Sequence, residues 1–406
     1  MKILYITTEG FDTPGPNNQM AITMIDKFLE DGFKVHLIES RRKRINSDIP
    51  QILEGRKNFS YDIVERKIID KTKFIKRFFD EAKYSIQSFK KWKKIKDNDI
   101  IFLQSCPTIV FQILLLKIFN KRPIVYNVYD VFPGHAYDIG VIKSKLIYNV
   151  FRVMQKITYK ASTIITVLSE DMKNKIVEQG VKPDKIHVVP PWYNEKEIKE
   201  IKKEHNKFIK KYKLDTEKFF VQFAGTIGYV FDYKTVIEVA KLLKEEKNIE
   251  IQIVGEGNVK EKFEKEVKQN NLENIKFYPL QPLEMVPDVY SACTICFIPL
   301  VKGVIGNGVP SKVPLLMACK RVIVNSVEKS EYYRIFNDNN MGISLENGDY
   351  QGIADAISYL YKNPEIRRRM ETNAKRYGEK KYTASKNVQK FIDIFYELGE
   401  KNKWKY

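Results

Sequence analysis

The sequence predicts an α/β protein made of two doubly wound parallel-sheet domains. Apolar runs of strand length alternate with helix-like segments along most of the 406 residues. Most of these runs are apolar throughout, which is typical of parallel strands covered by helices on both faces. A charged stretch at residues 194–218 interrupts the alternation and divides it into two series. A chain of this length also favours two hydrophobic cores over one.

The first series, residues 1–193, is expected to form an N-terminal domain. It opens with the apolar run KILYITTE, a turn-rich loop and a helical pattern ending at Gly32, before the strand KVHLIES. After a basic stretch, expected to be an insertion at residues 41–96, the alternation resumes. The later strands are expected at residues 99–105, 123–130, 163–169 and 185–192, and the helices at 108–119, 143–160 and 170–179.

The second series, residues 219–378, predicts a separate α/β domain, with residues 194–218 as the linker. Its strands are expected at residues 219–226, 249–257, 275–280, 294–300 and 321–325, and its helices at 233–246, 258–269, 283–292 and 312–319. Because ligands bind at the carboxyl ends of parallel strands, we expect the strand ends of both domains to face an interdomain cleft.

Basic residues are concentrated in the first domain. The chain carries a net charge of +19, and residues 41–96 alone hold 18 basic and 7 acidic residues. Aromatic side chains are interspersed with this charge: Phe74, Phe78, Phe79, Tyr84, Phe89 and Trp92. Such a segment favours an anionic membrane surface as partner. No RNP, helix-turn-helix or zinc-finger pattern accompanies it, which argues against nucleic acid. The alternative is a solvated helix face.

Cysteine usage and hydropathy favour a protein of the reducing cytoplasm. The four cysteines are too few and too scattered for a disulfide framework. Cys293 and Cys296 share a strand-like run, where they point to opposite faces, so no metal site is expected there. We find no signal-peptide pattern and no run long enough to span a membrane. The apolar segment 109–119 contains Lys117 and is expected to be a buried helix.

Three strand-end loops of the second domain carry glycine or polar residues: AGTIGY, GEGN and GNGVPSK. In the last loop, Ser311 suits a helix N-cap, Pro314 suits a first turn, and Lys312 supplies a cation. A glycine loop before a helix start is suited to a diphosphate. The alternative is that these loops are ordinary turns. None contains a Walker motif or a complete G-x-G-x-x-G, so a nicotinamide enzyme is poorly supported.

In the first domain, the segment VYDVFPGHAYDIG follows a strand. Asp130 ends that strand, which predicts a carboxylate at the cleft, and His135 lies in the loop after it. The alternative for Asp130 is the capping of the next turn.

The order of these motifs resembles retaining GT-B glycosyltransferases of family 4. The resemblance rests on FAGTIG, IVGEG and PSKVPLLMACKRVIV, and on the final segment, residues 379–406, which is similar to a helix that crosses back to the N-terminal domain. YDVFPGHAYDIGVI and GNGVPSK are most similar to the branch that transfers N-acetylated amino sugars in bacterial capsule and O-antigen assembly. The implied fold is GT-B, with two Rossmann-like domains.

The resemblance implies a donor site in the second domain. Its first loop lies near the phosphates, its second by the nucleoside, its third at the base, and its last at the sugar and diphosphate. The implied donor-binding residues are Gly225, Thr226, Gly228, Gly255, Glu256, Gly257, Leu280, Gln281, Asn307, Gly308, Ser311 and Lys312. Asp130 is implied as the catalytic residue, with Gly15, Asn17 and His135 on the acceptor side.

The sequence departs from this family at two places. Asn307 and Leu315 stand where the family has the two glutamates of its E-x7-E pair. The basic pair that often follows the first glycine loop is also absent, and Tyr229, Asp232 and Lys234 occupy that region.

The resemblance therefore implies a hexosyltransferase that moves an N-acetylated amino sugar from a UDP-sugar to a polyprenyl-diphosphate-linked saccharide, with retention of anomeric configuration. It implies no cofactor and no metal, and a place at the cytoplasmic face of the plasma membrane as a peripheral protein. The alternatives are a UDP-sugar epimerase of the same fold and a catalytically inactive glycan- or lipid-binding protein.

Overall fold

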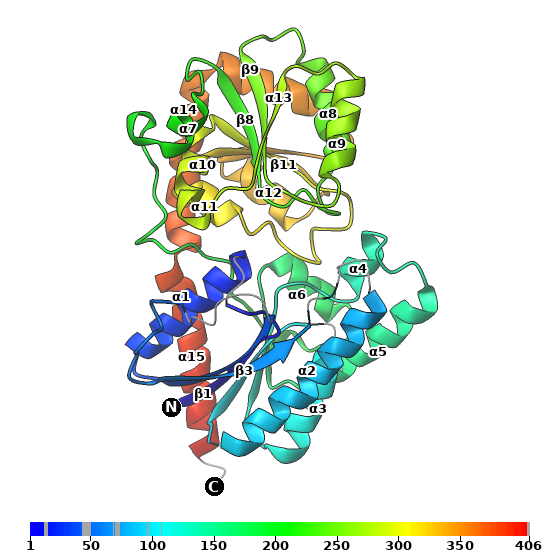
Figure 1. The fold of residues 1–406 in the computed structure, drawn as a ribbon, viewed down its shortest axis with the longest axis vertical. Helices are drawn as coiled ribbons and strands as arrows, with labels where there is room; N and C mark the ends of the chain where they lie inside the picture. Colours follow the sequence, from blue (N-terminus) through cyan, green and yellow to red (C-terminus); the bar gives the residue numbers. More distant parts are fainter. Residues whose placement is uncertain are drawn as a thin grey trace. The chain divides into compact units, whose positions relative to one another are not determined.

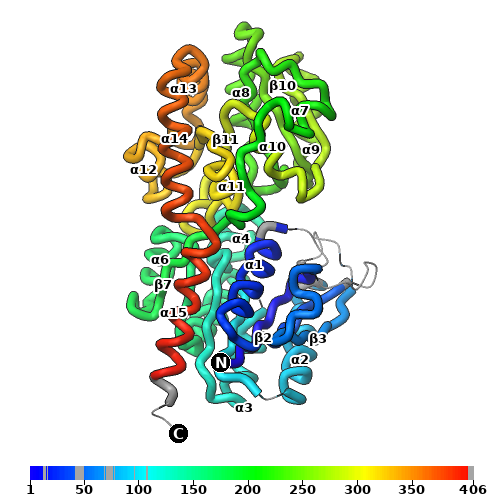
Figure 2. Tube along the Cα trace, turned by 90° about the vertical axis from the view of Figure 1, so that its left-hand side faces the viewer, coloured from blue at the N-terminus to red at the C-terminus, as the bar shows by residue number. Residues whose placement is uncertain are grey.

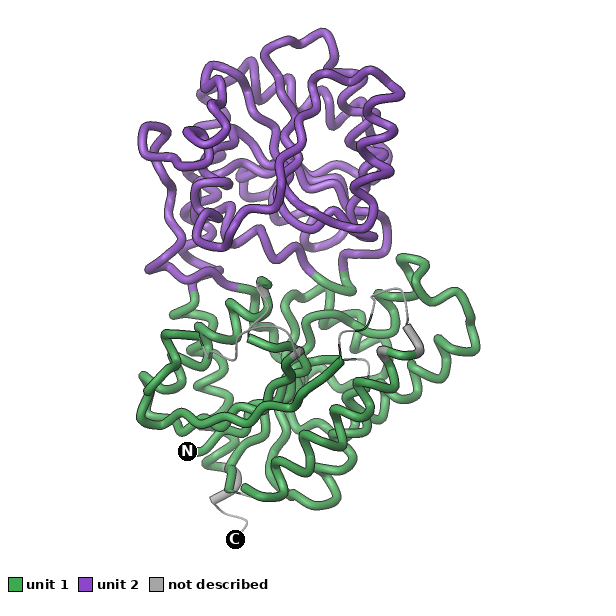
Figure 3. Tube along the Cα trace, in the orientation of Figure 1, with its two compact units in different colours: residues 1–191, 306–308, 384–406 green, residues 192–305, 309–383 purple. Residues whose placement is uncertain are grey.

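A computed structural model describes residues 1–11, 15–42, 50–67, 69, 74–95, 97–106 and 108–403. The chain forms two compact units (Figure 3). The first unit contains residues 1–191, 306–308 and 384–406, and the second contains residues 192–305 and 309–383. Each unit is built on one parallel sheet with helices packed against it (Figure 1). The expected α/β class with two Rossmann-like domains is confirmed.

The sheet of the first unit has seven strands in the order β3-β2-β1-β4-β5-β6-β7, all parallel. The strand order reverses between β1 and β4, which is the point where ligands bind in such sheets. Its strands are β1 Lys2–Ile6, β2 Lys34–Arg42, β3 Phe59–Arg66, β4 Ile100–Gln104, β5 Ile124–Val128, β6 Ile164–Val167 and β7 Ile186–Val188.

Helices cover both faces of this sheet. They are α1 Pro16–Glu30, α2 Phe74–Ile95, α3 Ile109–Phe119, α4 Gly134–Asp138, α5 Lys145–Ala161, α6 Glu170–Val177 and α15 Ala384–Lys403. The last helix, α15, packs against α1 (Figure 2), where the Phe28 and Phe395 rings lie 5.1 Å apart. The C-terminal segment thereby contributes to the hydrophobic core of the first unit.

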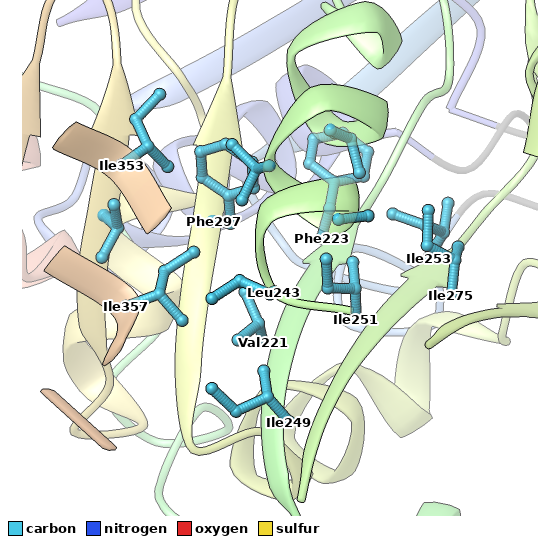
Figure 4. Packing of buried hydrophobic residues seen from close by; sticks show 14 of the residues in the cluster. Val221, Phe223, Leu243, Ile249, Ile251, Ile253, Ile275, Phe297, Ile353 and Ile357 are labelled. Carbon is cyan, nitrogen blue, oxygen red and sulfur yellow. The ribbon is translucent and has the colours of Figure 1, made fainter. Parts of the chain in front are cut away.

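The sheet of the second unit has six parallel strands in the order β10-β9-β8-β11-β12-β13. They are β8 Phe219–Ala224, β9 Ile249–Val254, β10 Ile275–Tyr278, β11 Ile295–Pro299, β12 Val322–Ser326 and β13 Gly342–Leu345. Its helices are α7 Lys207–Tyr212, α8 Tyr233–Leu242, α9 Lys260–Gln269, α10 Val286–Ala292, α11 Val313–Ala318, α12 Glu331–Asp338, α13 Tyr350–Lys362 and α14 Pro364–Lys381. Val221, Ile251 and Phe297 project from the strands into a core that Ile353 and Ile357 of α13 complete (Figure 4).

The basic stretch 41–96 is part of the first sheet layer and not an insertion. It supplies β3, which pairs with β2, and the long helix α2. Tyr84, Phe89 and Trp92 are buried, so these three aromatic side chains serve the core and not an interface. Phe79, by contrast, is 67% exposed. Residues 43–49, 68, 70–73 and 96 of this stretch, and the side chain of Phe74, lie outside the described residues.

Two further expectations differ from the structure. The charged stretch 194–218 includes α7, whose Phe208 ring packs 5.4 Å from that of Tyr278 in the second unit. The helix α3 is buried on one side only, because Ile118 is 71% exposed. Across the described residues, no helix combines the length and the apolar composition of a membrane span.

Candidate functional site

The first two glycine loops of the second unit are held together by their backbones. At the carboxyl ends of β8 and β9, the Gly225 N–H donates to the Val254 carbonyl (2.9 Å), and the Ile227 N–H donates to the Glu256 carbonyl (2.9 Å). A Cβ atom on Gly255 would lie 1.9 Å from the Gly225 carbonyl oxygen, and one on Gly257 would lie 2.0 Å from the Ile227 oxygen. Only glycine fits at these two positions, so both loops are fixed close together.

Lys312 reaches the same strand end from the last glycine loop. Its Nζ lies 3.4 Å from the centroid of the Phe223 ring, and a Cβ atom on Gly225 would lie 2.9 Å from that nitrogen. Desolvation lowers the pKa of Lys312 to about 8, and the nearby Cys296 thiol offsets this only in part. Among the described residues, no carboxylate forms an ion pair with Lys312. A desolvated ammonium without a counter-charge is suited to an anionic ligand.

The helix that follows Lys312 starts later than expected. α11 begins at Val313 and has six residues, with Pro314 in its first turn. The expected capping role of Ser311 is wrong, because Lys312 precedes the helix and no side-chain cap forms there. In this loop, the feature suited to an anion is therefore the ammonium of Lys312.

The other residues expected at the donor site differ in their environments. Thr226 is exposed, and Glu256 is paired with Lys260 at 2.6 Å. Leu280 is 61% exposed after β10, whose last residue, Tyr278, accepts a hydrogen bond from the Gly255 N–H (3.0 Å).

The side chain of Gln281 is occupied by the second unit itself. Its Nε2 donates to the Tyr212 hydroxyl (2.9 Å), and its Oε1 accepts from Lys211 (3.0 Å). Any role of Gln281 in binding a base would therefore use its backbone. Asp232 likewise has a structural role, because it caps α8 by accepting from the Thr235 N–H (3.2 Å).

In the first unit, carboxyl groups gather at the carboxyl ends of β1 and β5. Asp130 and Glu9 are both exposed to solvent as whole residues, but the protein around their carboxyl groups still desolvates these groups. Desolvation raises the pKa of Asp130, and the nearby His135 offsets this in part. Desolvation also raises the pKa of Glu9, as does the charge of Asp130, against hydrogen bonds from Asn17 and Gln104. Two acids with raised pKa values at a strand end are typical of a functional site.

Asn307 and Gly308 belong to this first-unit cluster. The Asn307 carbonyl accepts from the Val131 N–H (2.7 Å), and its Nδ2 donates to Asp138 (2.7 Å). A Cβ atom on Gly308 would lie 2.8 Å from Asp130 Oδ1. These two residues, expected on the donor side, therefore lie beside the proposed catalytic carboxylate within the first unit.

Of the residues expected on the acceptor side, Asn17 and His135 interact with these carboxyl groups. Asn17 hydrogen-bonds to Glu9, and Gly15 immediately precedes α1. The Nδ1 atom of His135 is buried and has no hydrogen-bond partner in the described part of the chain. The sequence analysis missed Glu9, although its position at the end of the first apolar run was a usable signal.

One D-x-D sequence, Asp97-Asn98-Asp99, lies at the amino end of β4, at the end of the sheet away from the carboxyl cluster. It precedes β4, whereas the carboxyl cluster follows the strands. Asp99 accepts from the Lys2 N–H (2.8 Å), and Asp97 pairs with the Lys2 ammonium. Both carboxylates thus fix the start of the sheet. No cluster of three or more potential metal-ligating side chains occurs within the described ranges.

Comparisons with known proteins give consistent matches for both units. The family model "Glycosyltransferase Family 4" matches residues 18–197, and "Glycosyl transferases group 1" matches residues 204–377. The chain is 24% identical to the probable glycosyltransferase WbjE of Pseudomonas aeruginosa over 67% of this chain and 68% of WbjE. It is 27% identical to the putative colanic acid biosynthesis glycosyl transferase WcaI of Escherichia coli over 42% of this chain and 41% of WcaI.

Solved structures match over almost the whole length. HepE of Anabaena, in complex with UDP-glucose, superposes with a TM-score of 0.74 at 13% identity and covers 98% of this chain and 100% of its own. This likeness concerns the fold of the chain.

Proposed function

Because the chain is a GT4-like glycosyltransferase with the GT-B fold, we propose that it transfers a hexosyl group, an N-acetylated amino sugar, from a UDP-sugar to a lipid-linked saccharide. The observation that carries this proposal is the desolvated ammonium of Lys312, which lies against Gly225 and pairs with no carboxylate of the described residues. A nucleotide diphosphate supplies the missing negative charge. The UDP-glucose bound to the structural neighbour HepE supports a UDP-sugar as the donor.

The acceptor and the sugar are proposed from the relatives and motifs. WcaI is named for colanic acid biosynthesis, which supports a surface polysaccharide as product. The resemblance of YDVFPGHAYDIGVI and GNGVPSK to the amino-sugar branch supports an N-acetylated hexosamine and retention at the anomeric carbon. A polyprenyl-diphosphate-linked acceptor would place the enzyme at the cytoplasmic face of the membrane, bound peripherally. The proposal includes no metal and no other cofactor.

In the proposed reaction, the bond between the anomeric carbon and the diphosphate oxygen breaks, and an acceptor oxygen forms the new bond. Negative charge grows on the leaving diphosphate, where Lys312 is already desolvated and needs little reorganisation to stabilise it. Ionised Asp130 is proposed to accept a hydrogen bond from the acceptor hydroxyl and to take its proton as the new bond forms. Glu9 and Asn17 are proposed to position that carboxylate.

Acceptor dependence tests the proposal. The full-length protein is incubated with a panel of UDP-sugars, with and without a short polyprenyl-diphosphate-linked saccharide, while UDP release and lipid mass are measured. We expect UDP release and a gain of one N-acetylhexosamine in mass only when the acceptor is present. Conversion of the UDP-sugar without acceptor would instead identify an epimerase, and binding without any turnover an inactive binding protein.

A thermal-shift panel identifies the donor independently of the acceptor. A ligand at 100 times its dissociation constant adds about 2.7 kcal/mol to the free energy of unfolding. We expect this stabilisation from one UDP-sugar and not from GDP- or ADP-linked sugars. If no UDP-sugar stabilises the protein, the proposed donor is wrong.

A further inference from the structure

Three helices of the first unit expose apolar side chains in rows. Of the 22 exposed large hydrophobic side chains among the described residues, 11 lie on α2, α3 and α5. On α5, Leu146, Val150, Val153 and Ile157 are exposed, and their spacing of i, i+4, i+7 and i+11 places them on one stripe. Its buried side chains, which include Phe151 and Tyr159, lie on the opposite side of the helix. An ordinary surface helix has polar residues where α5 has this stripe.

The neighbouring helices repeat this pattern. On α3, the exposed residues Phe111, Leu114 and Ile118 follow at i, i+3 and i+7. On α2, Phe79 and Ile86 are exposed and lie seven residues apart. Apolar rows thus recur on the solvent side of each helix. The exposed residues that we name the apolar helix face are Phe79, Ile86, Phe111, Leu114, Ile118, Phe119, Leu146, Ile147, Val150, Val153 and Ile157.

The three helices form one continuous layer. α2 packs against α3, and α3 packs against α5 (Figure 1). The Phe78 ring of α2 lies 6.3 Å from that of Phe111 and 5.4 Å from that of Phe151, so it joins all three helices. Phe89 and Phe119 make a second contact between α2 and α3 at 5.4 Å. The rows therefore belong to neighbouring parts of one surface.

The charge on this layer is almost entirely positive. Neither α3 nor α5 contains an aspartate or a glutamate. On α5, the exposed basic residues Arg152, Lys156 and Lys160 lie beside the stripe. On α2, exposed lysines alternate with the apolar residues along the solvent side: Lys76, Lys83, Lys90 and Lys93. Exposed apolar rows flanked by cations are the composition of segments that lie at a membrane interface.

We propose that the apolar helix face docks on an anionic lipid membrane, with α3 and α5 lying along the interface and their basic residues contacting lipid headgroups. This deepens the membrane part of the proposed function and assigns it to α2, α3 and α5. The stretch 41–96, which the sequence favours as the membrane surface, contributes only the solvent side of α2 to this face.

The charges favour lipid over the other occupants of such a surface. In a symmetric dimer through this face, the cations of α5 would meet helices α3 and α5 of the second copy, which contain no carboxylate to pair with them. In a complex with nucleic acid, the apolar rows between the cations would gain nothing from the phosphates. An anionic bilayer suits both the apolar rows and the cations, because apolar side chains enter the acyl boundary while lysines remain at the headgroups.

Flotation with lipid vesicles tests the docking. The full-length protein is mixed with vesicles of phosphatidylcholine alone or of phosphatidylcholine with phosphatidylglycerol, an anionic lipid, at low and high salt. We expect binding to the anionic vesicles that weakens with salt and does not vanish, since the apolar contribution is not screened.

Two matched pairs of variants locate the surface. The apolar variant carries Leu146→Ser, Val150→Ser, Val153→Ser and Ile157→Ser, and its control carries Leu242→Ser and Tyr359→Ser, at exposed apolar positions of the second unit. The charge variant carries Arg152→Glu, Lys156→Glu and Lys160→Glu, and its control carries Lys244→Glu, Lys265→Glu and Lys268→Glu, at exposed lysines of the second unit.

The apolar variant is expected to lower the vesicle partition coefficient about tenfold or more at both salt concentrations. The charge variant is expected to lower it by at least about fivefold per residue at low salt, because each substitution removes an attraction and adds a repulsion, and by less at high salt. Both controls should stay close to the wild type. Binding of the UDP-sugar in solution should be unchanged in all four, so a loss of docking is distinguishable from a failure of the donor assignment.

A fluorescence measurement detects docking without the apolar variant, which could lose binding because it misfolds. In the single variant Val150→Cys, a polarity-sensitive dye should brighten with anionic vesicles, whereas the same dye at Leu242→Cys should not. The proposal is overturned if the wild type ignores anionic vesicles at low salt, or if the apolar variant floats like the wild type. A dimer that the apolar variant abolishes, without lipid binding, would show that a second copy covers this face.

Discussion

The two candidate half-sites of this protein, one in each unit, differ in the charge that they carry. In the first unit, the strand ends carry the carboxyl groups of Asp130 and Glu9, and desolvation raises the pKa of both. In the second unit, the strand ends carry glycine backbone and the single cation Lys312, whose pKa desolvation lowers. Each unit thus holds a charge in an environment that disfavours it. Such environments are typical of ligand sites, where a bound molecule supplies the missing compensation.

This difference in charge suits the two sites to two different steps, donor binding and proton transfer. A desolvated cation beside rigid loops is suited to binding a diphosphate, whereas desolvated carboxyl groups are suited to handling a hydroxyl proton. Variants of the two half-sites should therefore affect different kinetic quantities. Donor affinity should depend on the second unit, and turnover on the first.

The largest effect is expected from Asp130→Asn. Loss of a catalytic carboxylate should reduce turnover by about 10²–10⁴-fold, while the dissociation constant of the UDP-sugar stays the same. Steady-state kinetics and calorimetry measure the two quantities separately. Asp184→Asn, at an exposed position of the same unit, is the matched control. If the Asn variant turns over normally, the role of Asp130 is structural.

The raised pKa of Asp130 predicts two further effects, one on the pH dependence of wild-type turnover and one on stability. Because the ionised form is the active one, wild-type turnover should rise with pH through a pKa above the ordinary aspartate value. Stability should behave in the opposite sense. Because its folded-state pKa lies above the unfolded value, the contribution of Asp130 to stability is fully present below the unfolded pKa and is lost as the pH rises through the folded pKa. Asp130→Asn should therefore unfold at a higher temperature than the wild type at neutral pH.

The rigidity of the second half-site is tested by Gly255→Ala. Its φ of 151° disfavours alanine, and the new Cβ atom would meet the Gly225 carbonyl oxygen. We expect a loss of about 2–4 kcal/mol in the free energy of unfolding, from strain and overpacking together. Gly348→Ala isolates the first contribution, because its φ is 87° and no atom lies within 4 Å of the new Cβ. That control should cost about 1–2 kcal/mol. Equal costs in a denaturant titration would contradict the close approach of the two loops.

Donor affinity should depend on Lys312. Lys312→Met keeps the apolar stem and removes the charge, and it should weaken UDP-sugar binding by roughly 1.5–3 kcal/mol, or about 10–150-fold. Turnover at saturating donor should fall less than in Asp130→Asn. The unliganded variant should also be more stable than the wild type at pH 7, since the desolvated charge is gone. If the variant binds the UDP-sugar with wild-type affinity, the diphosphate does not bind at this loop.

The smallest effect is expected from Gln281→Ala. Its side chain bonds to Tyr212 and Lys211, so its loss should cost about 1 kcal/mol of unfolding free energy. Donor affinity should not change, because only the backbone at this position is proposed to receive the base. A marked loss of affinity would show that the side chain contacts the nucleotide.

The fold was largely predictable from the sequence because parallel strands are short, apolar and regularly spaced. The strand β3 was missed, because FSYDIVER carries polar residues that suit an edge strand covered on one side. α3 was expected to be buried, since its composition alone does not distinguish a buried face from an apolar face left exposed.

The two half-sites differ in how well the sequence predicts them. The glycine loops of the second unit are local motifs, and each stands in one short segment. The carboxyl cluster of the first unit brings together Glu9, Gln104 and Asp130 from three distant strand ends. Only the sheet order, with β1 next to β4 and β4 next to β5, places these residues together. Sequence reasoning reached Asp130 and missed Glu9 for that reason.

Proton uptake on donor binding shows whether the diphosphate contacts Lys312. If the diphosphate sits against Lys312, binding should raise the pKa of this lysine from about 8 towards its ordinary value. At pH 8, calorimetric titration of the UDP-sugar in two buffers of different ionisation enthalpy should then show uptake approaching about half a proton per ligand. The uptake should disappear in Lys312→Met. Binding without proton uptake, or uptake that persists in Lys312→Met, would contradict the account.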